Sequence, residues 1–241
     1  MKTIEEILCR SIGLIYVGLR CVWERRDSMF ETPEDQAKDW EEVNEWFSSN
    51  GYGAYLTEEE RELVNIPALQ AGLEKAGPFS FLEECVPLLF WSIGLLEEPP
   101  HYYGETCAYD CVCKIGFMKD RHDRNALLAQ CKMRSKEEIE KQCNIAFLWH
   151  WRAVESRLNP KWRGNIRQVI HDTFGGVYDH CLDAFQMYDG KNNSDLLFNA
   201  RVIYELDRRS RNAFEMCAEM RHRALEWILC DEDWDETPTD T

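Results

Sequence analysis

Positive charge and long apolar segments are both scarce in this chain. Its 241 residues hold 28 Lys and Arg against 44 Asp and Glu, for a formal charge of −16. Because phosphate backbones bind clustered Lys and Arg, this balance disfavours sequence-independent nucleic-acid binding. The longest apolar run, VPLLFWSIGLL at residues 86–96, falls far short of the ~20 residues that cross a bilayer. Glu5 and Glu6 interrupt the opening where an export signal needs apolar residues. We therefore expect a cytoplasmic protein without a membrane span.

Recognised catalytic and cofactor-binding motifs are also missing. The sequence has no G-x-G-x-x-G or P-loop pattern, no nucleophile elbow and no H-E-x-x-H. Their absence favours a non-enzymatic role without excluding catalysis, and we predict no cofactor. The eleven cysteines are an odd number in a chain too long for a small disulfide scaffold, so we expect reduced thiols.

One group of residues has the ligand types of a Zn²⁺ site, namely His101, Cys107, Cys111, Cys113 and Cys131. Its C-x3-C-x-C spacing lacks the paired C-x2-C knuckles that are typical of zinc sites. Free cysteine is among the most buried residue types. Buried thiols are the favoured interpretation, and a metal site is the alternative.

Apolar residues recur at helical spacing along nearly the whole chain, without the alternation that is typical of strands. We predict an all-α fold, a single multi-helix globular domain built around a buried central helix at about 135–158. Ser135 and Glu138 form a capping box at its start. Further helices are expected at 3–26, with Val22 inward and a charged outer face, at 33–49 and at 80–96. Neither Gly nor Pro occurs in 194–230, which predicts one or two long helices there.

Charge is distributed unevenly along the sequence. Residues 1–100 hold 8 Lys and Arg against 20 Asp and Glu, whereas residues 101–230 hold 20 against 18. The last segment, 231–241, adds six acids and no base, which predicts an acidic, disordered and solvated tail. A basic protein is the partner that the acidic N-terminal part would suit.

The candidate site is a polar set within two apolar helical segments, 150–157 and 221–227. It consists of His150, Trp151, Glu155, Arg157, Arg221, His222, Glu226 and Trp227. These groups supply an acid, a base and an anion-binding arginine for a cleft. Ion pairs that fix helix register give the same pattern, and we favour that structural role. An unpaired buried charge is costly, so we expect Glu155 to pair with Arg152, Arg221 or Arg223.

Several segments resemble a bacterial family known as domain of unknown function 4272. They include RSIGLIYVGLR at 10–20, GYGAYLTEEERELV at 51–64, FLEECVPLLFWSIGLLEE at 81–98 and RSKEEI at 134–139. The family's HW-x-x-x-[DE]-x-R and R-x-x-A-L-x-W patterns match His150, Trp151, Glu155 and Arg157, then Arg221, Ala224, Leu225 and Trp227. About sixty residues separate the two patterns here, so we expect a helical insertion at 159–215 within a domain spanning 1–230. The resemblance implies no assigned activity.

The sequence leaves two functions open. The leading hypothesis is a helical protein-binding module whose acidic face engages a basic partner, for example an immunity-type inhibitor. An acidic surface that only keeps the protein soluble explains the charge equally well. The alternative is an enzyme or ligand-binding protein that acts on a small anionic molecule through Arg157 or Arg221. A cleft where these arginines converge with His150 would favour the alternative.

Overall fold

The computed structural model of the chain describes residues 1–24, 32–116 and 123–239. The α-helices are α1 (Ile4–Glu24), α2 (Pro33–Ser49), α3 (Glu58–Asn65), α4 (Gly72–Ala76), α5 (Val86–Ser92), α6 (Tyr109–Lys114), α7 (Arg124–Leu128), α8 (Lys136–Leu158), α9 (Ile166–Phe174) and α10 (Arg208–Leu229). The 3-10 helices are η1 (Tyr52–Tyr55), η2 (Gly77–Phe79), η3 (Leu82–Cys85), η4 (Gly176–Ala184), η5 (Ile203–Glu205) and η6 (Trp234–Glu236). The strands are β1 (Met187–Asp189), β2 (Ser194–Phe198) and β3 (Arg201–Val202).

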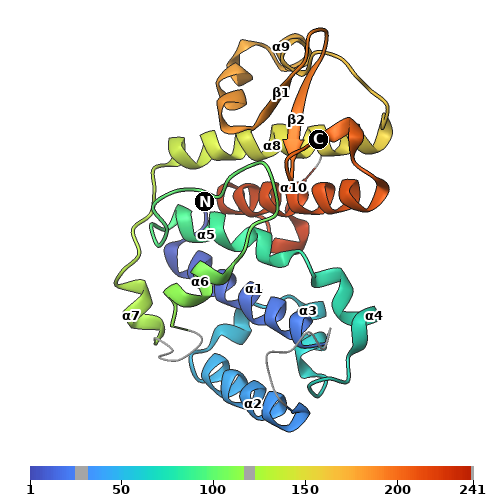
Figure 1. The fold of residues 1–241 in the computed structure, drawn as a ribbon. Coiled ribbons are helices and arrows are strands. Elements are labelled where there is room, and N and C mark those ends of the chain that lie inside the picture. The colour runs from blue at the N-terminus through green and yellow to red at the C-terminus, as the bar shows by residue number, and fades with distance from the viewer. Residues whose placement is uncertain (25–31, 117–122, 240–241) are drawn as a thin grey trace.

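Helices α8 and α10 lie side by side across the middle of the molecule (Figure 1). On one side of this pair are α9, η4 and the strands, and on the other are α5 and α1. Helix α2 lies at the far end, beyond α1. None of the described helices is both long and apolar enough to cross a membrane.

The capping signals in the sequence correctly mark several helix starts. Thr57 and Glu60 form a capping box at α3, and Ser135 and Glu138 form another at α8. The Thr32 hydroxyl accepts from the backbone N–H of Asp35 at the start of α2. In each case the cap satisfies backbone N–H groups that have no partner within the helix.

The prediction of an all-α fold is too strong, because a small antiparallel sheet with the order β1-β2-β3 lies near the C-terminal end. Met187 pairs with Leu196, and Leu197 pairs with Val202. Asn199 and Ala200 connect β2 and β3 with φ of 51° and 59°. Residues 199 and 200 thus form a left-handed turn, a conformation that usually needs Gly, although neither residue is Gly. The helix expected from residue 194 is therefore wrong, and α10 begins only at Arg208. The segment predicted as a helical insertion therefore contains all three strands.

Helix α1 is buried on nearly all sides, where the sequence predicted a charged outer face. Arg10 and Arg20 are 2% and 0% exposed, whereas Val22, predicted to point inward, is 37% exposed. Arg10 pairs with the buried Glu60, and Arg20 pairs with the buried Glu24. Charges can occupy this interior because each arginine has a carboxylate partner.

The helix predicted at 80–96 is shorter than expected. Residues 82–85 form η3, and α5 follows and ends at Ser92. Pro87 lies in the first turn of α5 instead of kinking a longer helix. Proline is tolerated there because its missing N–H would have no helical partner.

The predicted tail is not solvated along its whole described length, because Trp234 and Thr237 are buried among exposed acids. Trp234 begins η6, is 6% exposed and packs against Trp227 with ring centroids 5.4 Å apart. Lys2 Nζ donates to the carbonyl oxygens of Asp231 and Glu232, at 3.2 and 2.7 Å. A buried aromatic side chain and these hydrogen bonds hold an otherwise acidic segment against the body of the protein.

Candidate functional site

Helices α8 and α10 bring part of the predicted polar set together. Three contacts join the two helices: Cys143 with Glu226, His150 with His222, and Arg157 with Glu215. Residue numbers rise along α8 as those of the partners fall along α10. The helices are therefore antiparallel. Residues 143, 150 and 157 are seven apart, so they lie along one side of α8. This spacing places the polar groups along the contact between the two helices.

At the centre of this contact lie the buried side chains of His150, His222 and Cys143 and the half-buried Glu226, which we call the α8–α10 cluster. The Nδ1 atoms of His150 and His222 are 3.2 Å apart. The Cys143 thiol donates to Glu226 Oε1 at 3.2 Å, and His222 Nε2 lies 3.4 Å from the same oxygen. The ring of Phe147 packs edge-on against His222.

Burial governs the protonation of this cluster. It lowers the pKa of His150 to about 4, with smaller contributions from His222 and Arg223. It raises the pKa of the Cys143 thiol, and the Glu226 carboxylate adds to the effect. The neighbouring His222 ring lowers the pKa of Glu226. At neutral pH the cluster therefore contains a neutral His150, a protonated thiol and an ionised carboxylate.

The other predicted site residues lie elsewhere. Arg157 pairs with Glu215 on the surface, Trp151 packs on Phe174, and Trp227 packs on Trp234. Glu155 does not pair with an arginine among the described residues, contrary to prediction, and accepts a hydrogen bond from Asn159 at 3.0 Å. Its expected partner Arg152 binds Asp195 instead. Of the eight residues, the structure brings His150, His222 and Glu226 together.

Arg221 is fully engaged inside the protein. It donates to Glu84 Oε2 at 2.6 and 3.0 Å and to the carbonyl oxygens of His101 and Gly104 at 2.6 and 2.8 Å. Its guanidinium lies 4.6 Å from the centroid of the Trp149 ring. It therefore connects α10 to η3 and the 101–104 segment, and it is not directed into a cleft with His150.

The cysteine cluster considered for Zn²⁺ does not bring its ligands together. Cys111 is buried, whereas Cys107 and Cys113 are exposed. Among the described residues, Cys143, His222 and Glu226 are the group that places three metal-ligating atoms within 4.8 Å of one another. The sequence did not single out Cys143 for this role, because its partners are about eighty residues away on another helix.

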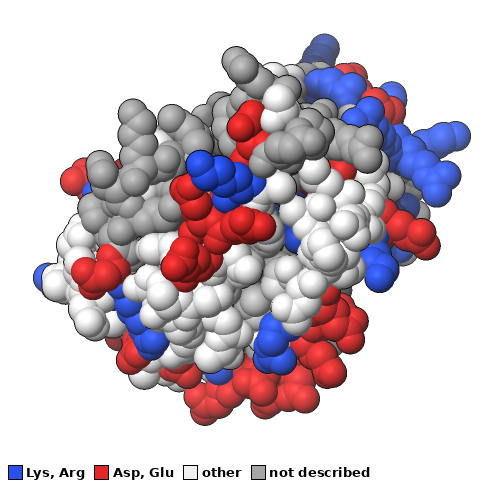
Figure 2. Space-filling model, turned by 90° about the horizontal axis from the view of Figure 1, so that it is seen from below, with Lys and Arg blue, Asp and Glu red and all other residues white. Residues whose placement is uncertain are grey.

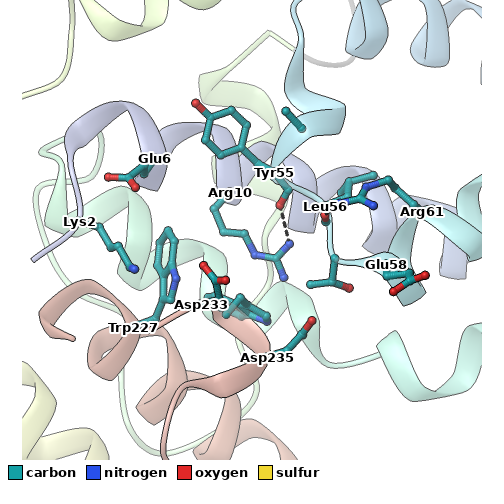
Figure 3. Close-up of a pocket in the computed structure, with 13 residues that line it drawn as sticks. Lys2, Glu6, Arg10, Tyr55, Leu56, Glu58, Arg61, Trp227, Asp233 and Asp235 are labelled. Carbon is teal, nitrogen blue, oxygen red and sulfur yellow. Dashed lines mark hydrogen bonds between the residues drawn. The ribbon is translucent and has the colours of Figure 1, made fainter. Parts of the chain in front are cut away.

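A second candidate is a cavity of about 370 Å³ between α1, α3 and the segment after α10, which we call the Arg10 cavity. Figure 3 shows Arg10 at its centre, with Tyr55 and Leu56 on one side and Asp233 and Asp235 on the other. Its walls are Lys2, Glu6, Arg10, Ala54, Tyr55, Leu56, Thr57, Glu58, Arg61, Trp227, Asp233, Trp234 and Asp235.

The cations of the Arg10 cavity already have partners. Arg10 donates to both carboxylate oxygens of Glu60 at 2.6 and 2.7 Å and to the Tyr55 carbonyl oxygen at 2.9 Å, with Trp234 stacked over it at 4.3 Å. Lys2 donates to carbonyl oxygens, and Arg61 donates to that of Leu56. Of these three cations, Arg10 is the one that a carboxylate of the described residues neutralises, because the Lys2 and Arg61 bonds are to uncharged carbonyl oxygens. The lining still holds more acids than bases, four against three.

Three carboxylates of the same cavity have no such partner. Glu58, Asp233 and Asp235 are exposed, and they form no ion pair with any residue that the structure describes. The fourth acid, Glu6, accepts hydrogen bonds from Thr3, which lower the pKa of its carboxyl group. Sequence reasoning missed this cavity because it assigned 231–241 to solvent. The one available signal was a tryptophan, Trp234, within a run of acids.

Acidic side chains continue beyond the cavity. Among the described side chains, the exposed acids include Asp35, Glu41, Glu42 and Glu45 on α2 and Glu58, Glu59 and Glu62 on α3. Figure 2 views the end of the molecule that carries α2 and shows acidic side chains gathered along its lower margin, while basic ones gather mainly at the upper right. The cavity and this acidic surface share α3.

Comparison with known proteins identifies the family but adds no activity. No curated protein and no solved structure matches the chain. A family model does match, over residues 1–170, which include α1 to α8 and Arg10, Glu58 and Cys143 but not α10. This match covers well over half of the sequence, and the chain therefore belongs to the family described as Domain of unknown function (DUF4272).

Proposed function

We propose that the protein is a protein-binding module that recognises a basic partner by accepting a Lys or Arg side chain in the Arg10 cavity. The observation that carries the proposal is the set of three carboxylates, Glu58, Asp233 and Asp235, without an ion-pair partner among the described residues. Carboxylates hold guanidinium and ammonium groups through charge-assisted hydrogen bonds.

The rest of the cavity suits the stem of such a side chain. Trp227, Trp234 and Tyr55 provide aromatic surface, and the alkyl stems of Lys and Arg pack on apolar surface while their charged ends stay polar. The volume of about 370 Å³ lies at the lower end of the range of about 300–1,000 Å³ for ligand pockets.

The acidic surface on α2 and α3 supports the same class of partner. Complementary charge steers association and raises its rate, and salt weakens this effect. An immunity-type inhibitor, which blocks a basic protein, is one form of such a module. The alternative of an enzyme for small anions has less support, because Arg157 pairs with Glu215 and Arg221 pairs with Glu84.

The test compares three versions of the full chain as bait in the source cytoplasm. They are the natural protein, Glu58→Gln/Asp233→Asn/Asp235→Asn, and a control in which three exposed acids outside the cavity are neutralised, Glu97→Gln/Glu98→Gln/Glu137→Gln. The affinity of the natural protein is then measured for short synthetic peptides from any captured partner. In these peptides each Lys or Arg is replaced in turn by Gln.

We expect the cavity variant to bind about tenfold more weakly, since each partly exposed ion pair contributes up to ~1 kcal/mol. The control should bind nearly as well as the natural protein. Raising salt from about 0.05 to 0.5 M should weaken binding of the natural protein most. Equal losses in the two variants, or no salt-sensitive basic partner, would refute the proposal.

A further inference from the structure

The α8–α10 cluster contains the ligand set of a metal site. Cys143 offers a sulfur, His222 a ring nitrogen and Glu226 a carboxylate oxygen, all within 4.8 Å of one another. Sγ and Nε2 lie 3.2 and 3.4 Å from Glu226 Oε1. Zn²⁺ bonds of about 2.0–2.3 Å in a tetrahedron separate neighbouring ligand atoms by roughly 3.3–3.8 Å. Two of the three ligand separations are therefore already near the spacing of a zinc tetrahedron, and the third is within 4.8 Å.

An unsatisfied nitrogen points to the same site. His222 Nε2 is buried and has no hydrogen-bond partner among the described residues, because its contact with Glu226 is within ion-pair distance but lacks hydrogen-bond alignment. Buried polar atoms nearly always have a partner, and an exception calls for one such as an ion. The His222 side chain is only 3% exposed, whereas that of Glu226 is 33% exposed. An ion can therefore enter past Glu226.

The other histidine offers an acceptor for the tautomer that coordination needs. The two Nδ1 atoms are 3.2 Å apart, so one of them carries the hydrogen between them. When His222 Nδ1–H donates to His150, the lone pair of His222 Nε2 faces Cys143 and Glu226. Metal-binding histidines usually donate their second ring N–H to such an acceptor.

We propose that Cys143, His222 and Glu226 bind one Zn²⁺, with a fourth position open to water on the exposed side of Glu226. A thiolate, an imidazole and a carboxylate together favour Zn²⁺ over the hard cations Mg²⁺ and Ca²⁺. Binding forms a sulfur–zinc bond and releases the Cys143 proton to solvent. The ion cross-links α8 and α10, and His150 is a positioning residue that touches His222 and not the metal.

The experiment uses the full chain, freed of metal by chelation and then titrated with Zn²⁺ alone. The bound metal is counted by mass spectrometry, and Co²⁺ substitution reports a tetrahedral site through its visible absorption and thiolate charge-transfer bands. We expect one Zn²⁺ per chain and a rise in Tm on binding. His150→Leu should weaken Zn²⁺ binding by about 10–100-fold, which is typical of a lost supporting hydrogen bond.

Cys143→Ser and Glu226→Gln should each weaken Zn²⁺ binding more than His150→Leu does. Cys143→Ser should also remove the thiolate band, and Glu226→Gln should change the cobalt spectrum. The matched control is Cys217→Ala, which removes a buried thiol on α10, the helix of His222 and Glu226, and should keep full binding. The triple variant Cys107→Ser/Cys111→Ser/Cys113→Ser should also keep full Zn²⁺ binding. Because Glu226 is partly exposed, Glu226→Gln remains informative if Cys143→Ser misfolds. Failure of the natural chain to bind Zn²⁺ stoichiometrically, or unchanged affinity in folded Glu226→Gln, would overturn the proposal.

Discussion

The buried ion pair between Arg152 on α8 and Asp195 on β2 should be a major contributor to stability. Arg152 Nε and Nη2 donate to the two carboxylate oxygens at 2.8 and 2.6 Å, and the side chains are 2% and 0% exposed. Asp195→Ala leaves the guanidinium buried without its partner. Such a loss costs ~3–5 kcal/mol of unfolding free energy, out of a total of roughly 5–15 kcal/mol for a typical protein.

The assay is urea unfolding followed by circular dichroism, with thermal melting as a second measure. At ~2–4 °C per kcal/mol for a chain of this size, Tm should fall by about 6–20 °C in Asp195→Ala. The matched control is Glu155→Ala on the same helix, whose carboxylate accepts only from Asn159 and should contribute under ~1 kcal/mol.

A double variant distinguishes the loss of the whole pair from the loss of one member. Arg152→Met/Asp195→Leu replaces both charges with apolar side chains and should recover most of the stability lost in Asp195→Ala. The reasoning is refuted if Asp195→Ala costs no more than Glu155→Ala, or if the double variant is no more stable than Asp195→Ala.

Three further predictions concern local features of the fold. Ser135→Ala removes the cap of α8 and should cost ~1 kcal/mol in urea unfolding, whereas Lys136→Ala, beside it on the surface, should cost little. Trp234→Ala should cost about 3–5 kcal/mol if its packing on Trp227 and Arg10 is as tight as in a core, and a variant as stable as the natural chain would mean that the segment is loosely held. The pKa of His150 is lowered to about 4 in the folded chain, below the unfolded value of about 6.5, so the stabilising effect of its neutral form is present above about 6.5 and is lost as pH falls through 4. In chelator-treated protein, His150→Gln should flatten this loss, and an unchanged pH profile would contradict the assignment.

Helix starts were predictable because capping is local. The cap of α8 needs only Ser135 and Glu138, three residues apart. The strands were not predictable on this basis, because β2 is the short segment SDLLF and does not alternate simply between apolar and polar residues. Its state depends on pairing with 187–189 and on the turn at Asn199, which follow from contacts between segments and not from local periodicity.

The need for charge partners was also predictable, but not their identities. An apolar environment around Arg152 and Arg221 shows that each needs a carboxylate. The actual partners are Asp195, 43 residues away, and Glu84, 137 residues away. The nearby candidate Glu155 lies within reach of Arg152 along α8 but accepts a hydrogen bond from Asn159 instead. The α8–α10 cluster was partly predictable because His150 and His222 fall on apolar helical faces, whereas Cys143 was indistinguishable from an ordinary buried thiol.

The four buried arginines explain how a strongly acidic chain keeps a neutral interior. Arg10, Arg20, Arg152 and Arg221 each pair with a buried acid, respectively Glu60, Glu24, Asp195 and Glu84. Their charges cancel, so the formal charge of −16 lies entirely outside these pairs. Buried pairs are screened by salt much less than surface charges, whose interactions fall off within about 8 Å at physiological ionic strength. Salt therefore acts mainly on the surface charges and much less on the pairs that hold the helices together. The salt dependence of the proposed binding can thus be measured without unfolding the protein.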